Sequence, residues 1–500
     1  MQYLHTVVFL LVCTLVSSCA KQTPPMESAR TAIVNATVID AINGVRTGQT
    51  IVFEGDEILS VGPAITLAEG VQQIDGTGKF VIPGLWDMHV HLTASSLFDT
   101  SILPLLLSYG VTSVRDTGGM LEDLLPLVEK SKQGFYPGQR IFYSGPLLDG
   151  EFVVYDGSSL FRPSTGTANT VPEKAALTVA ELKKSGASFI KIYEMVEPEV
   201  FDALVKAAED ENLPVAAHVP LSTRAGQIAP RLDSMEHLRN IMLDCAANAE
   251  DLLALRREML NNDEGLLGGD LRSSIHREQR PLALKNLDAE QCERTVKALV
   301  GTIQVPTLSL GNRGEGFATR EDWLDAVTRL PEPVSSIWLA AGSIKRTTTD
   351  SARAQAAAQK DMVRQMYEAG VVFGAGTDIP IPPSVPGHSL HLELEALVAA
   401  GLSPLEAIGA ATLTPAKFFS IEHEMGSIDA GKKADMLILT LDPLDDIGNT
   451  QSIDGIIAQG RYLDGSDIAV LVDDSREGTL KLDALSLGYK LMTVLGFSLF

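Results

Sequence analysis

The stretch that decides the fold runs from residue 81 to 91: Val81-Ile82-Pro83-Gly84-Leu85-Trp86-Asp87-Met88-His89-Val90-His91. This apolar run, introduced by proline and glycine, predicts a β-strand, in which alternate side chains point to the same face. Asp87, His89 and His91 therefore share one face, where Asp87 is placed to accept a ring N–H from the imidazoles. The spacing indicates two histidine ligands for a metal at a strand end, with two hydrogen-bonded core histidines as the alternative.

The middle of the chain alternates apolar strands with helical stretches, a pattern typical of parallel α/β folds. We expect eight strands, at residues 84–91, 111–116, 140–145, 188–193, 213–218, 233–237, 303–309 and 371–377. Eight such units close a (β/α)8 TIM barrel, whose functional residues lie at the carboxyl ends of the strands. The longest interruption, residues 240–300, is rich in helix and charge and is expected to lie over one of these ends.

Short β-like segments occur at both ends of the chain, between Thr31 and about Ile82 and again after Gly426. They predict a small β-sandwich built from both termini. The expected organisation is therefore a signal peptide (1–18), a tether (19–30), the first part of the sandwich (31–83), the barrel (84–425), the second part of the sandwich (426–466) and a C-terminal tail (467–500).

Residues 7–16 form an apolar run that is too short to span a bilayer as a helix, and small residues follow it. This pattern predicts a secretory signal, with an uncleaved helix as the alternative. The sequence Leu15-Val16-Ser17-Ser18-Cys19 resembles the lipobox of bacterial lipoproteins, although no Lys or Arg precedes the apolar run. The resemblance implies export to the periplasm or the outer membrane, with a lipid on Cys19 as the only membrane anchor.

The chain has 500 residues and a formal net charge of −24, which argues against nucleic acid or an anionic membrane surface as a partner. Cys245 and Cys292 remain once the predicted signal and the lipid site are removed. They could pair in an oxidising compartment, but the sequence does not place them within bonding distance. The oligomeric state is also left open.

Four further polar residues stand at or near the ends of predicted strands: Lys191, His218, His237 and Asp378. Lys191 lies within an apolar strand, where an unpaired ammonium is costly. Carboxylation by carbon dioxide would turn it into a carbamate that bridges two cations, and a carboxylate partner is the alternative. Each of the other three could be a satisfied histidine or a helix N-cap. Their common order along the strands instead predicts one metal centre.

In these motifs the chain resembles the amidohydrolase superfamily, in its imidazolonepropionase-like and prolidase-like branch, over about residues 31–465. The motifs that carry the resemblance are GVTSVRDTGG (110–119), FIKIY (189–193), HVP (218–220), SMEHL (234–238), GTD (376–378), PGHSLHLEL (386–394) and GKKAD (431–435).

By position, the resemblance implies two divalent metal ions, expected to be Zn²⁺. The buried metal would be held by His89, His91 and Asp378, the exposed one by His218 and His237, and carboxylated Lys191 would bridge them.

The expected reaction is hydrolysis of a C–N bond, in a dipeptide or an N-acyl amino acid, by a hydroxide that bridges the two metals. Asp378 would take the proton of that hydroxide and deliver it to the leaving nitrogen. Tyr193, on the face of Lys191, either donates to the oxyanion or simply lines the barrel. The alternatives are a cyclic-amide hydrolase or a deaminase, an esterase or lactonase, and, in another class, a solute-binding lipoprotein without catalysis.

Apart from His5 in the predicted signal peptide, four histidines remain outside this constellation. We expect His276, in the helical insertion, and His423, in a polar turn, to lie at the surface. His388 and His391 enter a helix after the last strand and are candidates for substrate contact. Loops around 145–170 and 240–300 are expected to select the side chain of the substrate.

Overall fold

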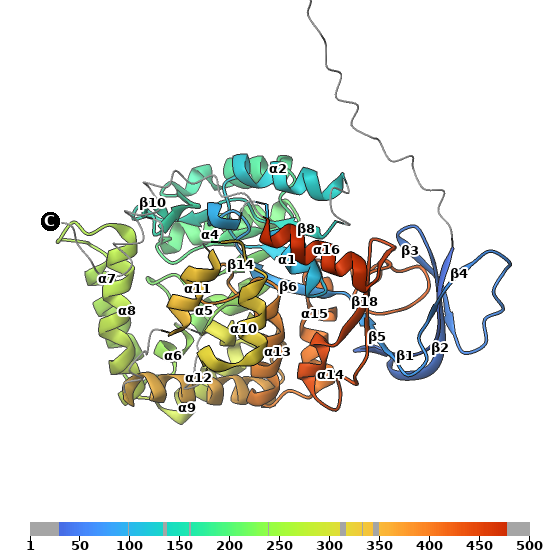
Figure 1. The fold of residues 1–500 in the computed structure, drawn as a ribbon. Helices are drawn as coiled ribbons and strands as arrows, with labels where there is room; N and C mark the ends of the chain where they lie inside the picture. Colours follow the sequence, from blue (N-terminus) through green and yellow to red (C-terminus); the bar gives the residue numbers. More distant parts are fainter. Residues whose placement is uncertain are drawn as a thin grey trace, which may run out of the picture.

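The protein was analysed as a computed structural model, which describes residues 30–98, 100–133, 138–159, 162–238, 240–310, 317–332, 334–343 and 350–477. The predicted signal peptide, Cys19, nearly all of the tether and residues 478–500 lie outside this range. Figure 1 shows a β-rich part beside a larger α/β body. Among the described residues, no helix combines the length and the apolar character needed to cross a bilayer.

The β-rich part is one sheet of strands from both ends of the chain. Its strands are β1 (Thr31–Asp40), β2 (Gly44–Glu54), β3 (Glu57–Gly62), β4 (Gln72–Asp75), β5 (Phe80–Pro83), β17 (Met436–Leu439), β18 (Ile453–Ala458) and β19 (Arg461–Leu463). The order is β19-β18-β17-β5-β1-β2-β3, and β4 also pairs with β1. The long β1 pairs along both of its edges, so the hydrogen bonds join all strands in a single sheet and not in the two separate sheets expected of a sandwich.

The α/β body contains two parallel sheets. The first holds β6 (Leu85–Val90), β7 (Val111–Asp116) and β8 (Arg140–Tyr143). The second runs in the order β12 (Gly166–Ala168), β9 (Leu147–Asp149), β13 (Ile190–Ile192), β14 (Val215–Ala217), β15 (Ser234–Glu236) and β16 (Ile303–Val305). Seven of the eight predicted strands are therefore present, and the sequence analysis did not predict β9, β12 or the hairpin of β10 (Asp156–Ser159) and β11 (Arg162–Ser164).

The eighth predicted strand, residues 371–377, forms only isolated bridges, one of them from Phe373 to Gln304 of β16. On its other side, the backbone N–H of Asp378 donates to the carbonyl of His89 over 2.7 Å. A Cβ on Gly376 would lie 2.7 Å from the Cβ of His89, so glycine permits this close approach. The segment thus joins the edge of β16 to that of β6.

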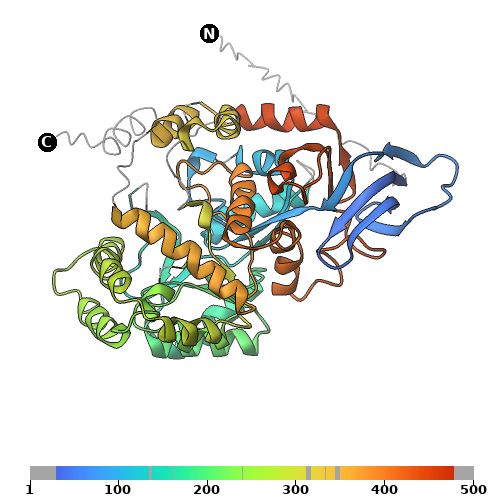
Figure 2. The same cartoon turned by 90° about the horizontal axis from the view of Figure 1, so that it is seen from below.

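The helices surround the sheets of the body (Figure 2). They are α1 (Ile102–Ser108), α2 (Leu121–Lys132), α3 (Ala175–Lys184), α4 (Pro198–Asp210), α5 (Ala225–Ile228), α6 (Ile241–Asp244), α7 (Ala249–Met259), α8 (Gly268–Lys285), α9 (Ala289–Ala298), α10 (Glu321–Thr328), α11 (Val334–Ser343), α12 (Asp350–Glu368), α13 (His388–Ala400), α14 (Pro404–Ala410), α15 (Leu413–Phe418) and α16 (Gly465–Arg476). Short 3₁₀ turns are η1 (Ser96–Phe98), η2 (Pro172–Lys174), η3 (Ala229–Arg231), η4 (Leu308–Leu310), η5 (Phe317–Thr319) and η6 (Ile447–Gln451).

Residues 240–300 form the helical insertion, made of α6 to α9, as the sequence predicts. Cys245, which follows α6, and Cys292 of α9 form a disulfide. The bond fastens the two ends of the insertion to each other. The start of the predicted C-terminal tail is also ordered, because α16 packs on the body and the Ser475 hydroxyl donates to the carbonyl of Arg329 over 2.8 Å.

Candidate metal centre

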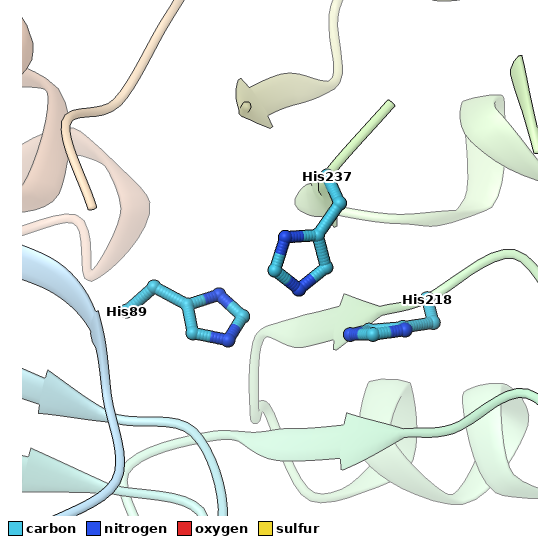
Figure 3. Close-up of side chains that lie close together, drawn as sticks. All are labelled: His89, His218 and His237. Atoms are coloured by element: carbon cyan, nitrogen blue, oxygen red, sulfur yellow. The ribbon is translucent and has the colours of Figure 1, made fainter. Parts of the chain in front are cut away.

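The carboxyl ends of the strands converge on one cavity. Its lining is His89, His91, Leu147, Tyr155, Lys191, Tyr193, His218, His237 and Asp378. The structure thus brings together every residue predicted for the site. In Figure 3 the imidazoles of His89, His218 and His237 face one another, and one ring nitrogen of each lies within 4.8 Å of the others. Ligand atoms of His89, His91 and Asp378 form a second such group.

Two of the histidines bond to buried carboxylates through Nδ1. His89 Nδ1 is 2.6 Å from Glu236 Oε2, and His218 Nδ1 is 2.8 Å from Glu194 Oε1. A carboxylate accepts only, so each Nδ1 carries the proton and each Nε2 is left with a free lone pair. Both rings therefore have the tautomer that a metal ligand needs.

The other two histidines bond through Nδ1 to a backbone carbonyl and to a side-chain hydroxyl. His91 Nδ1 is 3.0 Å from the carbonyl of Gly118, and His237 Nδ1 is 2.6 Å from the hydroxyl of Thr307. That hydroxyl donates its own proton to the carbonyl of Pro306 over 2.8 Å, so it accepts from the ring. All four imidazoles thus offer Nε2 to the cavity.

Burial keeps most of these rings neutral. It lowers the pKa of His89 to about 4 and that of His218 to about 3, and it holds the pKa of His237 well below its ordinary value. Neutral imidazole is the form that binds a cation. Three of the rings are therefore in the form that could hold a metal ion at neutral pH.

Asp378 lies among the rings. Its Oδ1 is 3.3 Å from Nε2 of His91, and its Oδ2 is 3.7 Å from Nε2 of His237. Burial opposes its charge, but the nearby imidazoles outweigh burial and hold the pKa of Asp378 below its ordinary value. Asp378, His237 and Thr307 have φ angles of 60°, 59° and 49°, a region that residues with a Cβ rarely adopt. Backbone strain of this kind gathers at functional sites.

Lys191 is fully buried, and its Nζ has no hydrogen-bond partner among the residues that the structure describes. Glu236 Oε1 is 3.9 Å away, but this carboxylate is already bonded to Arg115 over 2.6 Å and to His89. Burial lowers the pKa of Lys191 to about 8. The amine thus lies in the cavity without a hydrogen bond, beside groups that could hold a metal ion.

The prediction that Asp87 orients the imidazole rings is wrong. Asp87 accepts the backbone N–H of His89 over 3.1 Å and the hydroxyl of Thr377 over 2.6 Å, so its carboxylate ties β6 to the segment before Asp378. The acceptor for His89 is instead Glu236. Sequence reasoning missed this residue, although an acid in the apolar strand before His237 was a visible signal.

The prediction that His276 lies at the surface is also wrong. His276 is 4% exposed, and its Nε2 is 2.6 Å from Glu194 Oε2, because α8 packs this face against the end of β13. His388 and His391 are buried away from the cavity, against Asp322 and Thr450 respectively.

Tyr193 lines the cavity as predicted, with its ring 4.3 Å from that of His218. Burial raises its pKa well above the ordinary value, so the phenol keeps its proton. Sequence reasoning did not name Tyr155, which lies between β9 and β10 in one of the loops expected to select the substrate. Its ring is 5.7 Å from that of Tyr193, and it also lines the cavity.

The model of the amidohydrolase family matches residues 80–246 and 326–463, more than half of the chain. The protein belongs to the amidohydrolase family. A solved Xaa-Pro dipeptidase with methionine in its active site matches this amidohydrolase with a TM-score of 0.61 and 22% identity, over 87% of this chain and 100% of the other. A putative prolidase from Bifidobacterium longum matches with a TM-score of 0.59 and 26% identity, over 90% of this chain and 99% of the other.

A curated sequence relative matches a much shorter part of the chain. The adenine deaminase of Edwardsiella ictaluri is 32% identical over 88 residues, which are 18% of this chain and 15% of that protein. The matched part thus spans far less than two thirds of the relative.

Proposed function

We propose that this amidohydrolase uses two divalent cations, such as Zn²⁺, to hydrolyse the amide bond of a dipeptide or an N-acyl amino acid. The observation that carries the proposal is the buried Nζ of Lys191, which has no hydrogen bond among the described residues, beside four histidines and Asp378 in one cavity. Neutral imidazoles and a carboxylate suit divalent cations of this kind.

The proposal includes a (β/α)8 barrel as the scaffold. Residues 371–379 bridge β16 to β6, and residues 144–146 carry the chain from β8 directly into β9. A ring of eight parallel segments with the ligands at one end accounts for both features.

Each residue has a defined place in the site. His89, His91 and Asp378 would hold one cation, His218 and His237 the other, and a carbamate on Lys191 would join the two sides. Carbamate formation needs the neutral amine. Nζ attacks the carbon of CO₂, an N–C bond forms as one C=O π bond opens onto its oxygen, and Nζ gives a proton to water. When bound, the cations polarise the scissile carbonyl and lower the pKa of water.

Asp378 takes the proton from the attacking water and passes it to the leaving nitrogen. Its ionised carboxylate and its position between the imidazoles of His91 and His237 suit this role. The protonated phenol of Tyr193 donates to the oxyanion that forms on the carbonyl.

Two aromatic residues, Tyr155 and Tyr193, wall the cavity and suit a compact substrate with an apolar part. Structural neighbours described as an Xaa-Pro dipeptidase and a prolidase support a dipeptide. Deamination of a ring is the second candidate, because the sequence match to an adenine deaminase favours it.

The test is a substrate screen with metal-loaded protein. Dipeptides and N-acyl amino acids form one set, and adenine and cyclic amides form the other; release of amine or ammonia is measured with and without a chelator. We expect chelator-sensitive turnover in the first set. Turnover that survives complete metal removal would refute a metal hydrolase, and turnover confined to the second set would select the second candidate.

We also propose that the protein is exported and lipid-anchored at Cys19. The disulfide between Cys245 and Cys292 supports an oxidising compartment, where such bonds persist.

A further inference from the structure

We infer that the helical insertion is part of the metal centre: Arg272 and His276 of α8 position the ligand His218 through Glu194. The inference rests on the proposed function, because it assigns these residues to one of the two cations. In this inference α8 does more than cover the strand ends, because its residues also position a ligand.

Glu194 joins three elements. It follows β13, is 1% exposed, and its Oε1 accepts from Nδ1 of His218 and from Nη2 of Arg272, each over 2.8 Å. Its Oε2 is 2.6 Å from Nε2 of His276. Arg272 and His276 are four residues apart and therefore lie on the same face of α8. The ligand, the acceptor and the helix thus form one continuous network.

The contacts explain why the network needs both helix residues. Glu194 is buried, and Arg272 and His276 each supply one of its bonds beside the bond to His218. A carboxylate acceptor fixes the ring of His218 and strengthens Nε2 as a ligand. A buried carboxylate that loses a partner is strongly destabilised.

Contacts on the other side of Arg272 and at the start of α8 place the helix against the cavity. The guanidinium of Arg272 lies 5.7 Å from the ring centre of Tyr193, a cavity residue. Asp270, in the first turn of α8, accepts from Arg162 of the β10–β11 hairpin over 3.0 Å. Both contacts hold α8 where it meets Glu194.

The test compares cation binding in variants of the full chain. Arg272→Met and His276→Leu remove one partner of Glu194 each, and His276→Gln restores a donor. Arg277→Met, on the exposed side of α8, is the matched control. The two dissociation constants for Co²⁺ are measured by competition with a chelator, together with the absorption spectrum of the bound Co²⁺ and the melting temperature.

We expect Arg272→Met and His276→Leu to raise one of the two dissociation constants by about 10- to 100-fold. The absorption bands of the Co²⁺ ion at that site should change, and those of the other Co²⁺ ion should not. His276→Gln should recover most of the affinity, and Arg277→Met should match the parent. Unchanged affinity in both variants would overturn the inference. So would equal loss at both cations with a lower melting temperature, because that result reports unfolding of the insertion. A parent protein that binds no cation would instead overturn the proposed function itself.

Discussion

Carboxylation of Lys191 is the prediction that tests the centre most directly. Carbon dioxide reacts only with the neutral amine, so the reaction depends on the pKa of the side chain. At a pKa of about 8, roughly one Lys191 in ten is neutral at pH 7, against about one in three thousand for a lysine at the ordinary value of 10.5. Burial thus makes this amine roughly 300-fold more available than an exposed lysine.

The magnitude also sets the pH dependence. A lowered pKa means that the neutral fraction rises with pH, from about one in a hundred at pH 6 to about one half at pH 8. At equal concentrations of dissolved CO₂, metal-free protein should therefore gain the carbamate roughly 50-fold faster at pH 8 than at pH 6.

The assay is ¹³C NMR of protein incubated with ¹³C-bicarbonate, with metal content measured in parallel. The carbamate signal and full metal content should be absent in Lys191→Met. Both should persist in Lys206→Met, which replaces an exposed lysine paired with Asp210. A carbamate signal that survives in Lys191→Met, or full metal content and turnover without Lys191, would refute the reasoning.

Three further predictions concern Asp378, His91 and Cys19. Asp378→Asn keeps an oxygen for the cation but cannot take a proton. Turnover should therefore fall at least about a hundredfold while the metal is retained. Turnover within a few-fold of the parent at every pH would contradict this. Burial opposes protonation of His91, but Asp378 outweighs burial and raises the pKa of His91 above 6.5. The affinity for Co²⁺ should therefore fall as the pH drops below that pKa. Equal affinity at pH 8 and pH 6, measured by chelator competition, would contradict this prediction. In a Gram-negative host given radiolabelled palmitate, the parent should carry label and Cys19→Ser should not; equal labelling would exclude a lipid on Cys19.

Much of the parallel fold could be predicted because each strand is a local apolar run. Residues 111–116 form a strand with the predicted bounds, and the other strands are shorter than predicted. The segment 371–377 was misjudged, because Gly374 and Gly376 fit against Met88 and His89 in a way that regular pairing does not require. Apolar content predicts where a segment is buried, but close packing decides whether it forms a regular strand.

The two errors at the site share a physical cause. The period of a strand fixes which side His89 faces, but not which neighbour supplies the acceptor for Nδ1. That acceptor, Glu236, is 147 residues away in sequence, and Glu194 is 82 residues away from His276. Such hydrogen-bond partners depend on the order of strands in the sheet and on where the helical insertion packs. Neither of these leaves a local pattern in the sequence.

The residues at the strand ends and those in the two loop segments differ in what fixes their positions, and this difference bears on how the protein can select its substrate. The ligands stand on strand ends, and their positions are fixed by the scaffold. The hairpin bonded to Asp270 and the helix that carries Arg272 both belong to the two segments expected to vary with substrate. Because Arg272 also touches Glu194, a change in those segments acts on His218 as well as on the cavity wall. Under the proposed function, selection of the substrate and tuning of the metal site would therefore share the same residues.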